Sequence, residues 1–260
     1  MVISLENVVK IFGKNRVIDD VSVTFPSGKI SVVVGEHGSG KTTMLRLVAG
    51  ELKPDYGKIT AKKRITKAFA YDNNNFFEGL KIADYCTVWT LLYRNFDTKK
   101  FISILSEAGI QGSAKVPNLS KEMKAWFDIA LVISSNADIM IFDEPLLYID
   151  QPMQVKILDL FEKAAEEGKT VIVGAQEISE FENSAEFVAV LNNGSLVMTG
   201  ETEKLLLSHR LFPGASTISP DFKVIGPVLN ERLIETSDDI GRKATLKEIV
   251  LGYINGSVSR

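Results

Sequence analysis

A glycine-rich run between a short apolar segment and a helical pattern constrains this chain more than any other feature. The run extends from Gly35 to Thr43 and has the spacing G-x-x-x-x-G-K-T. It follows the strand-like segment Ile30 to Val34 and precedes the helical pattern Met44 to Val48. Glycines let the backbone curl so that successive N–H groups point at an anion, and a helix N-terminus adds partial positive charge. The context therefore predicts a phosphate-binding loop in an α/β protein.

Each part of the loop has a separate expected task. Lys41 would reach the β- and γ-phosphates of a nucleotide, and the Thr42 hydroxyl would ligate Mg²⁺. A glycine-rich turn without function is the alternative, which the strand before the run and the helix after it disfavour. The nucleotide-binding residues expected here are Gly35, Gly38, Ser39, Gly40, Lys41, Thr42 and Thr43.

Composition excludes several classes of protein. The 260 residues are 45% hydrophobic and 24% charged, which is ordinary for a globular protein of one or two domains. A net charge of -3, without any zinc-finger or RNA-binding pattern, gives no reason to expect a nucleic-acid partner. Cys86 is the single cysteine, and neither a signal peptide nor a long apolar stretch is found. We therefore expect a cytosolic chain that reaches a membrane only through a partner.

The order of patterns along the chain predicts a mixed α/β core with a helical insert. The segments Val2 to Val9 and Val21 to Phe25 alternate like half-exposed strands. Ile30 to Val34 and Ile139 to Phe142 are continuously apolar, as in buried parallel strands. Helical spacing dominates residues 80–135 between them. The basic run Lys58 to Lys67 is assigned to the solvated face of a hairpin.

The remaining part of the chain continues the alternation and then changes character. A helix is expected over Gln154 to Glu166, a strand over Thr170 to Gly174, and a hairpin over Phe187 to Thr199 with its turn at Asn192-Asn193-Gly194. A Pro- and Ser-bearing segment follows, before a terminal helix over Thr245 to Ile254. We divide the chain into a main domain, residues 1–207, and a C-terminal extension, residues 208–260.

Two adjacent carboxylates provide the second chemical feature. Asp143 and Glu144 end the apolar run that begins at Ile139, and ligands bind at this end of strands in parallel sheets. Phosphoryl transfer needs one carboxylate to hold hydrated Mg²⁺ and one group to orient or deprotonate water. Asp143 suits the first role and Glu144 the second. A solvated turn is the alternative, which the phosphate loop upstream disfavours.

Together these motifs resemble the ATPase subunit of an ABC transporter, over about Ser4 to Glu203. Leu119-Ser120-Lys121-Glu122-Met123 stands in the place of the family's Leu-Ser-Gly-Gly-Gln signature, and its Ser120 would bind nucleotide. Phe12, with Val17, stands where the family stacks an aromatic ring on adenine; a ring packed on the core is the alternative. Asp150 occupies the loop that touches the opposite subunit.

The resemblance implies a fold, cofactors and partners. The fold is a P-loop α/β core, with a mixed sheet, an antiparallel β subdomain, a helical subdomain at about 80–135 and a small C-terminal extension. Two such subunits close head to tail around two molecules of ATP with Mg²⁺. Each site then combines the phosphate loop of one subunit with the signature helix of the other. A transmembrane permease would hold the chain peripherally on the inner, cytoplasmic face of the cell membrane.

Three residues depart from the family pattern. Asp72 aligns with the magnesium-sensing glutamine; it can still reach Mg²⁺ but, when ionised, cannot donate a hydrogen bond. Gln176 aligns with the histidine that contacts γ-phosphate, and its amide can donate but carries no charge. Glu122 replaces a signature glycine, which adds bulk and negative charge next to a phosphate. Asp72, Gln176 and Glu144 are the catalytic candidates; Thr42, Asp143 and Asp72 are the metal-ligand candidates.

These departures leave several functions open. The chain is an ordinary transport ATPase that tolerates them, or an unequal member of a heterodimer with one active site, or a regulatory clamp that hydrolyses little ATP. An ABC protein acting on ribosomes or DNA would need a second cassette or a long coiled-coil insert, which the sequence lacks. The segment Ala244 to Leu251 resembles the end of exporter subunits and favours export over import; a capped helix on the core is the alternative. Phe76 and Phe77 are predicted to contact the permease.

Overall fold

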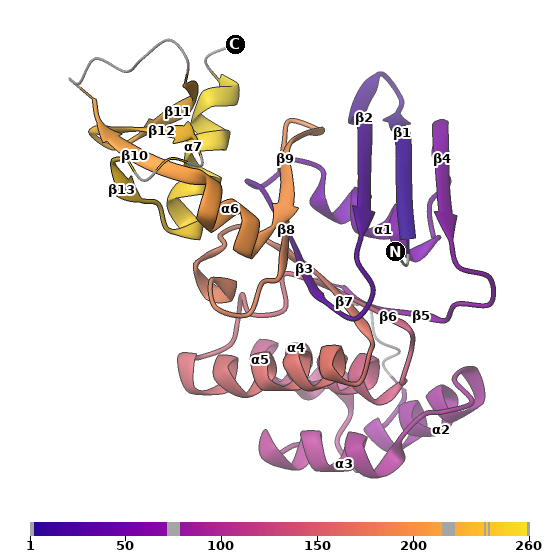
Figure 1. Ribbon diagram of the computed structural model, residues 1–260. Coiled ribbons are helices and arrows are strands. Elements are labelled where there is room, and N and C mark those ends of the chain that lie inside the picture. The colour runs from indigo at the N-terminus through magenta and orange to yellow at the C-terminus, as the bar shows by residue number, and fades with distance from the viewer. Residues whose placement is uncertain (1–2, 72–78, 215–221, 237, 239, 259–260) are drawn as a thin grey trace.

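A six-stranded sheet forms the centre of the molecule (Figure 1). The computed structural model describes residues 3–71, 79–214, 222–236, 238 and 240–258. The strand order is β5-β6-β7-β3-β8-β9, parallel except for the edge strand β9. Its strands are β3 (Ile30–Val34), β5 (Lys67–Ala70), β6 (Ile139–Asp143), β7 (Thr170–Ala175), β8 (Phe187–Asn192) and β9 (Ser195–Glu201).

Both faces of this sheet are covered, which explains its continuously apolar strands. β3, β6 and β7 are buried at every residue. Alternate residues enter two different cores: Val33 packs with α1 (Lys41–Ala49) and the N-terminal strands, whereas Val32 packs with the helices on the other face. The predicted buried strands at Ile30 to Val34 and Ile139 to Phe142 are confirmed.

The N-terminal strands form a separate antiparallel sheet in the order β2-β1-β4. Its members are β1 (Ile3–Phe12), β2 (Asn15–Phe25) and β4 (Tyr56–Ala61). The prediction of a hairpin over Lys58 to Lys67 is wrong, because β4 pairs with β1 whereas β5 pairs with β6. The connection between them passes from one sheet to the other, and an alternation pattern cannot reveal which strand is the partner.

Helices cover the other face of the central sheet. The predicted helical insert contains α2 (Ile82–Leu92), α3 (Thr98–Glu107), the short helix η1 (Val116–Asn118) and α4 (Lys121–Ser134). α4 lies beside α5 (Gln151–Glu166) under the sheet (Figure 1). Trp126 of α4 is fully buried and donates its indole N–H to the carbonyl of Ile104, 2.6 Å away, which fixes α3 against α4.

The C-terminal residues build a second small sheet with its own helix. The sheet has the antiparallel order β11-β12-β10-β13, and α7 packs against it; we call these elements the C-terminal module (Figure 1). Sequence patterns identified its helix but not its strands. The elements after β9 are α6 (Thr202–Ser208), β10 (His209–Pro213), β11 (Lys223–Val228), β12 (Glu231–Glu235), β13 (Arg242–Lys243) and α7 (Leu246–Val258). A short helix, η2 (Ser179–Phe181), lies between β7 and β8.

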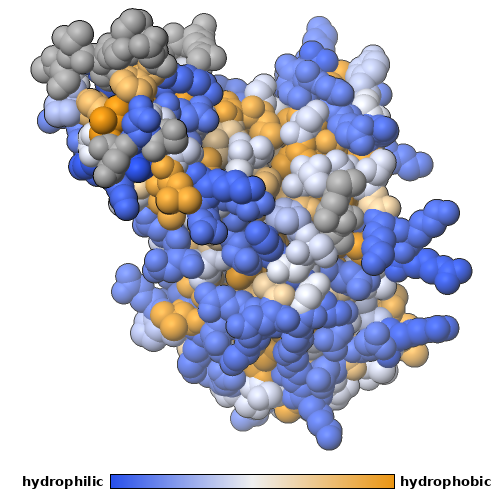
Figure 2. All heavy atoms as spheres, viewed as in Figure 1, coloured by the Kyte–Doolittle hydropathy of each residue, from blue (hydrophilic) through white to orange (hydrophobic). Residues whose placement is uncertain are grey.

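The visible surface is mainly hydrophilic. Figure 2 shows small, separate hydrophobic areas over the helices at the bottom and below the C-terminal module. Leu91 and Leu92 of α2 are among the exposed apolar side chains. Within the described ranges, no helix has both the length and the apolarity needed to cross a bilayer. Phe76 and Phe77 lie outside the described residues.

Candidate nucleotide site

The phosphate loop joins the end of β3 to the start of α1, as predicted. Gly40 begins the helix with a φ of 105°, and no described side chain hydrogen-bonds the first N–H groups of α1. A Cβ atom at Gly35 would lie 2.3 Å from the carbonyl oxygen of Leu191, so this position excludes any side chain. The loop therefore holds a helix N-terminus open toward an anion.

Lys41 is held inside the loop. Its side chain is 6% exposed, and its ammonium group donates to the carbonyls of Gly35 at 2.7 Å and Glu36 at 3.2 Å. A third contact joins Lys41 Nζ to Glu144 Oε1 at 3.2 Å. An ammonium has three hydrogens, so these contacts use all of its donors and fix its position. A phosphate placed above the loop would compete for this charge.

Thr42 and Asp143 meet although 101 positions separate them. The Thr42 hydroxyl donates to Asp143 Oδ2 at 2.6 Å, and the Asp143 carboxylate is buried at the end of β6. Mg²⁺ takes oxygen ligands and keeps several of its waters. A hydroxyl and a carboxylate at this spacing, next to a phosphate loop, fit that preference.

Glu144 lies directly beyond the strand. Its backbone has a φ of 49°, and its N–H donates to the carbonyl of Gly174 at 2.9 Å. The side chain is fixed from both sides, since Oε1 pairs with Lys41 and Oε2 accepts the backbone N–H of Gln176 at 3.1 Å. Burial raises the pKa of the Glu144 carboxyl, and the negative charge of Asp143 adds to this, whereas Lys41 opposes it. A raised pKa suits a carboxylate that accepts a proton.

These groups surround one cavity of about 410 Å³. Val17 is on its wall, whereas Phe12 is 45% exposed at the end of β1 and is not among the lining residues that the structure describes. Asp72 lies outside the described residues. Three lining residues, His37, Leu147 and Tyr148, were not predicted from the sequence. Leu147 and Tyr148 lie only a few positions after the Asp143–Glu144 pair, which could have indicated them. The lining is formed by Val17, His37, Gly38, Gly40, Lys41, Thr42, Thr43, Asp143, Glu144, Leu147, Tyr148 and Gln176.

The signature segment and Asp150 lie at other helix ends. Ser120 caps α4 by accepting the N–H of Met123 at 3.2 Å, and Asp150 caps α5 by accepting the N–H of Met153 at 3.0 Å. Neither is among the described residues that line the cavity. The Lys121 ammonium lies 5.0 Å from the centre of the Tyr148 ring, which connects the signature helix to the edge of the cavity.

Comparison with known proteins identifies this arrangement. A family model described as "ABC transporter" matches residues 18–147, which include the phosphate loop, the signature segment and the Asp143–Glu144 pair. The chain belongs to the ABC transporter family. It is an ATP-binding cassette, and its mixed sheet, antiparallel β subdomain and helical subdomain confirm the predicted fold class.

Curated relatives of this ABC cassette are ATP-binding proteins of transporters. The glutamate transport ATP-binding protein GluA of Corynebacterium efficiens is 28% identical over 77% of this chain and 91% of its own length. The arginine transport ATP-binding protein ArtM of Bacillus subtilis is 28% identical over 80% and 95%. The lantibiotic transport ATP-binding protein SrtF of Streptococcus pyogenes is 23% identical over 76% and 90%.

Solved structures share the fold of this cassette. An ATP-binding subunit of an ABC transporter aligns with a TM-score of 0.71 and 17% identity, over 79% of this chain and 92% of the other. The dimeric structure of a bacterial ABC transporter cassette aligns with a TM-score of 0.66 and 22% identity, over 76% and 98%. Both alignments leave out about a fifth of this chain, so the ABC core accounts for most but not all of it.

Proposed function

We propose that this chain is the ATP-hydrolysing motor subunit of an ABC membrane transporter, with Mg²⁺ as its metal. The observation that carries the proposal is the Glu144 carboxylate, held between the Lys41 ammonium at 3.2 Å and the Gln176 N–H at 3.1 Å. It lies next to the Thr42–Asp143 pair, so a base, a cation and two oxygen ligands share one cavity.

Each residue of the site has a separate proposed role in ATP hydrolysis. The N–H groups at the start of α1 bind phosphate oxygens, and Lys41 exchanges its carbonyl contacts for the β- and γ-phosphates. Thr42 and Asp143 hold Mg²⁺, which when bound neutralises charge on the phosphates. Glu144 orients the attacking water and accepts its proton, while the Gln176 N–H fixes the carboxylate. The Gln176 side chain donates to the γ-phosphate without adding charge, and Asp72 is proposed as a further metal contact.

The proposed partners are supported by the positions of two site residues. Ser120 and Asp150 cap helices and are not among the described residues that line the cavity of their own chain, which supports their proposed contribution to the site of a second ABC subunit. Phe12, with Val17, is proposed to contact the adenine at the open end. The membrane contact is proposed to run through a permease, which places the subunit on the cytoplasmic face of the cell membrane.

The direction of transport stays a prediction. The names of the relatives include methionine import, for MetN of Clostridioides difficile, and lantibiotic transport, for SrtF. The segment that favours export contains Thr245 and Glu248, which form a reciprocal cap at the start of α7: Glu248 Oε2 accepts the Thr245 N–H at 2.9 Å, and Thr245 Oγ1 accepts the Glu248 N–H at 3.3 Å. This capping gives the motif a structural role of its own.

A second candidate function is a clamp that binds ATP but hydrolyses little of it. The Ser120 hydroxyl accepts the N–H of Met123, which is one of the N–H groups at the start of α4 that a phosphate would otherwise use, and Glu122 adds negative charge in the first turn of that helix. Both features weaken the attraction of this helix end for a phosphate. A heterodimer would then have one efficient site, at the phosphate loop of this chain, and one site that mainly holds nucleotide.

The decisive experiment measures phosphate release by the purified chain with Mg²⁺ and ATP. We expect turnover that falls at least about 100-fold in Glu144→Gln, because the base is lost, while ATP binding persists. Glu166→Gln, on the exposed face of α5, is the matched control and should leave the rate unchanged. ATP binding without turnover that depends on Glu144 would reject the motor and favour the clamp.

A further inference from the structure

The C-terminal helix contacts the ATPase core at both of its ends. α7 lies along the module on the side that faces β8 and β9, and it packs against both strands (Figure 1). The solved ABC structures named above align with less than four fifths of this chain. The contacts of α7 with the core indicate its role.

The first end of α7 contacts the segment that follows β7. Lys247 Nζ lies 3.8 Å from Glu177 Oε2, and the Lys247 backbone N–H donates to Glu182 Oε1 at 3.4 Å. Glu177 directly follows Gln176, whose own N–H donates to the Glu144 carboxylate. The start of α7 thus contacts one residue on each side of η2, and one of these, Glu177, is the neighbour of Gln176.

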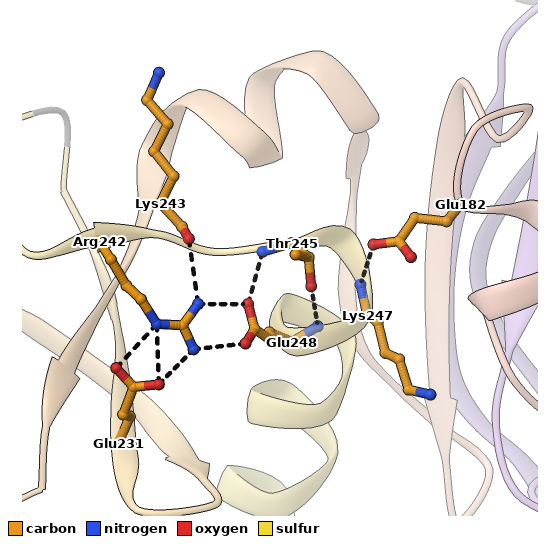
Figure 3. A network of polar contacts seen from close by, with 7 residues as sticks. All are labelled: Glu182, Glu231, Arg242, Lys243, Thr245, Lys247 and Glu248. Atoms are coloured by element: carbon orange, nitrogen blue, oxygen red, sulfur yellow. Dashed lines mark hydrogen bonds and ion pairs between the residues drawn. The ribbon is translucent and has the colours of Figure 1, made fainter.

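An ionic cluster fixes this end of α7 to its own sheet (Figure 3). The Arg242 guanidinium contacts both Glu231 and Glu248, with Arg242 Nη2 2.6 Å from Glu248 Oε1. Hydrogen bonds from Arg242 lower the pKa of the Glu248 carboxyl, so the charges persist through the neutral range. Lys247 therefore extends from a helix end whose position is already set.

The second end of α7 contacts the turn behind the phosphate loop. The Asn192 amide donates to the Ser257 hydroxyl at 2.6 Å. Two residues later, the Gly194 N–H donates to the carbonyl of Ser39, inside the phosphate loop, at 2.9 Å. The helix therefore connects the two structural elements that form opposite parts of the nucleotide site.

A second cavity lies between α7 and the segment that follows β7, although the middle of α7 packs into the core, where Ile249 and Val250 are buried. It has a volume of about 400 Å³, and Val250, Leu251 and Ile254 of α7 contribute to its lining. His37 and Gln176 line this cavity as well as the nucleotide cavity. Ile178 of that segment and Val250 of α7 belong to the same buried core, so apolar packing and the end contacts of α7 together hold the segment.

We propose that α7 positions the Gln176 N–H on the Glu144 carboxylate, with Lys247 as the positioning residue. The inference rests on the proposed role of Glu144 as the base. Lys247 touches neither nucleotide nor base; it acts through Glu177 on the backbone of the neighbouring residue. An exposed ion pair contributes little, so the effect of its loss is several-fold rather than complete.

The first test measures hydrogen exchange at the Gln176 amide in the full chain. We expect exchange to be about three- to fivefold faster in Lys247→Ala, because the segment opens more often. Lys243→Ala is the matched control: it is the same substitution in the same module, and the Lys243 side chain points away from the cluster in Figure 3. Equal exchange in the two variants would overturn the proposal. Unchanged exchange in Glu144→Ala would also overturn it, since the amide would then not be held by that carboxylate.

The second test measures steady-state ATP hydrolysis by the same variants. Lys247→Ala should lower kcat by about three- to fivefold and change KM less than twofold, because the base is misplaced while the phosphate loop is intact. A purely structural loss would lower the active fraction and leave exchange at Gln176 unchanged in the folded protein. A wild-type chain without Glu144-dependent turnover would reject the proposed motor function, yet the exchange result would still decide whether α7 positions Gln176.

Discussion

The N-termini of α1 and α4 are chemically opposite although both belong to motifs of the same ATPase family. α1 begins at a glycine in the left-handed region, has no acidic residue in its first turn and buries Lys41 beside the free N–H groups. α4 begins at Ser120, whose hydroxyl already accepts the N–H of Met123, and carries Glu122 in its first turn. The N-terminus of α1 is suited to attract a phosphate, whereas at the N-terminus of α4 a side chain of the helix itself accepts an N–H hydrogen bond. This difference supports the proposal that the two nucleotide half-sites of this chain differ in their attraction for phosphate.

The largest expected effect is at α1. Lys41→Ala should weaken ATP binding about 100-fold, because charge-assisted hydrogen bonds to phosphate are lost. Binding of a fluorescent ATP analogue measures this, with Lys121→Ala at the start of α4 as the matched control. Equal losses in the two variants would erase the contrast between the helix ends.

The pH dependence of turnover tests the proposed base, Glu144, beside the phosphate loop. The pKa of Glu144 is raised, and only the ionised carboxylate can accept a proton. The rate should therefore fall as the pH falls through this raised pKa, by about tenfold per pH unit below it. Rates measured from pH 8 down to the lowest pH at which the chain stays folded test this, and the residual activity of Glu144→Gln should not show the same fall. A flat profile in the wild-type chain would contradict the role of Glu144.

A smaller effect is expected from the charge at α4. Glu122→Gln removes the negative charge and keeps the shape, so turnover at high protein concentration should rise by about threefold to fivefold if α4 faces the γ-phosphate of a partner. The same change at Glu203, in the first turn of α6, is the control and should have no effect. An unchanged rate in Glu122→Gln would show that this signature tolerates the carboxylate.

The smallest effect concerns stability alone. Ser120→Ala should lower the free energy of unfolding by about 1 kcal/mol, because the Met123 N–H loses its cap. Urea denaturation measures the change. Ser106→Ala, on the exposed surface of α3, is the control and should change the stability by less than about 0.5 kcal/mol. A loss at Ser120 no larger than this would indicate that the α4 end is not self-capped.

Local spacing explains which parts of the site were predictable. The phosphate loop is continuous in sequence, so the roles of Gly35, Gly40 and Lys41 follow from residue types a few positions apart. The Asp143–Glu144 pair follows from the apolar strand before it. The predicted hairpin over Lys58 to Lys67 was wrong because β4 and β5, which are adjacent in sequence, belong to different sheets. The partner of a strand depends on contacts between residues distant in sequence.

The amino-acid sequence alone was sufficient to predict a phosphate loop, a carboxylate pair at a strand end and the order of motifs of an ABC cassette. Those features consist of short-range patterns, in which neighbouring residue types dictate the backbone conformation. The contact of the Gln176 N–H with Glu144, and the contacts of α7 with Glu177 and Asn192, could be found only in the folded structure. Such contacts join residues far apart along the chain, and their distances are set by the packing of whole elements.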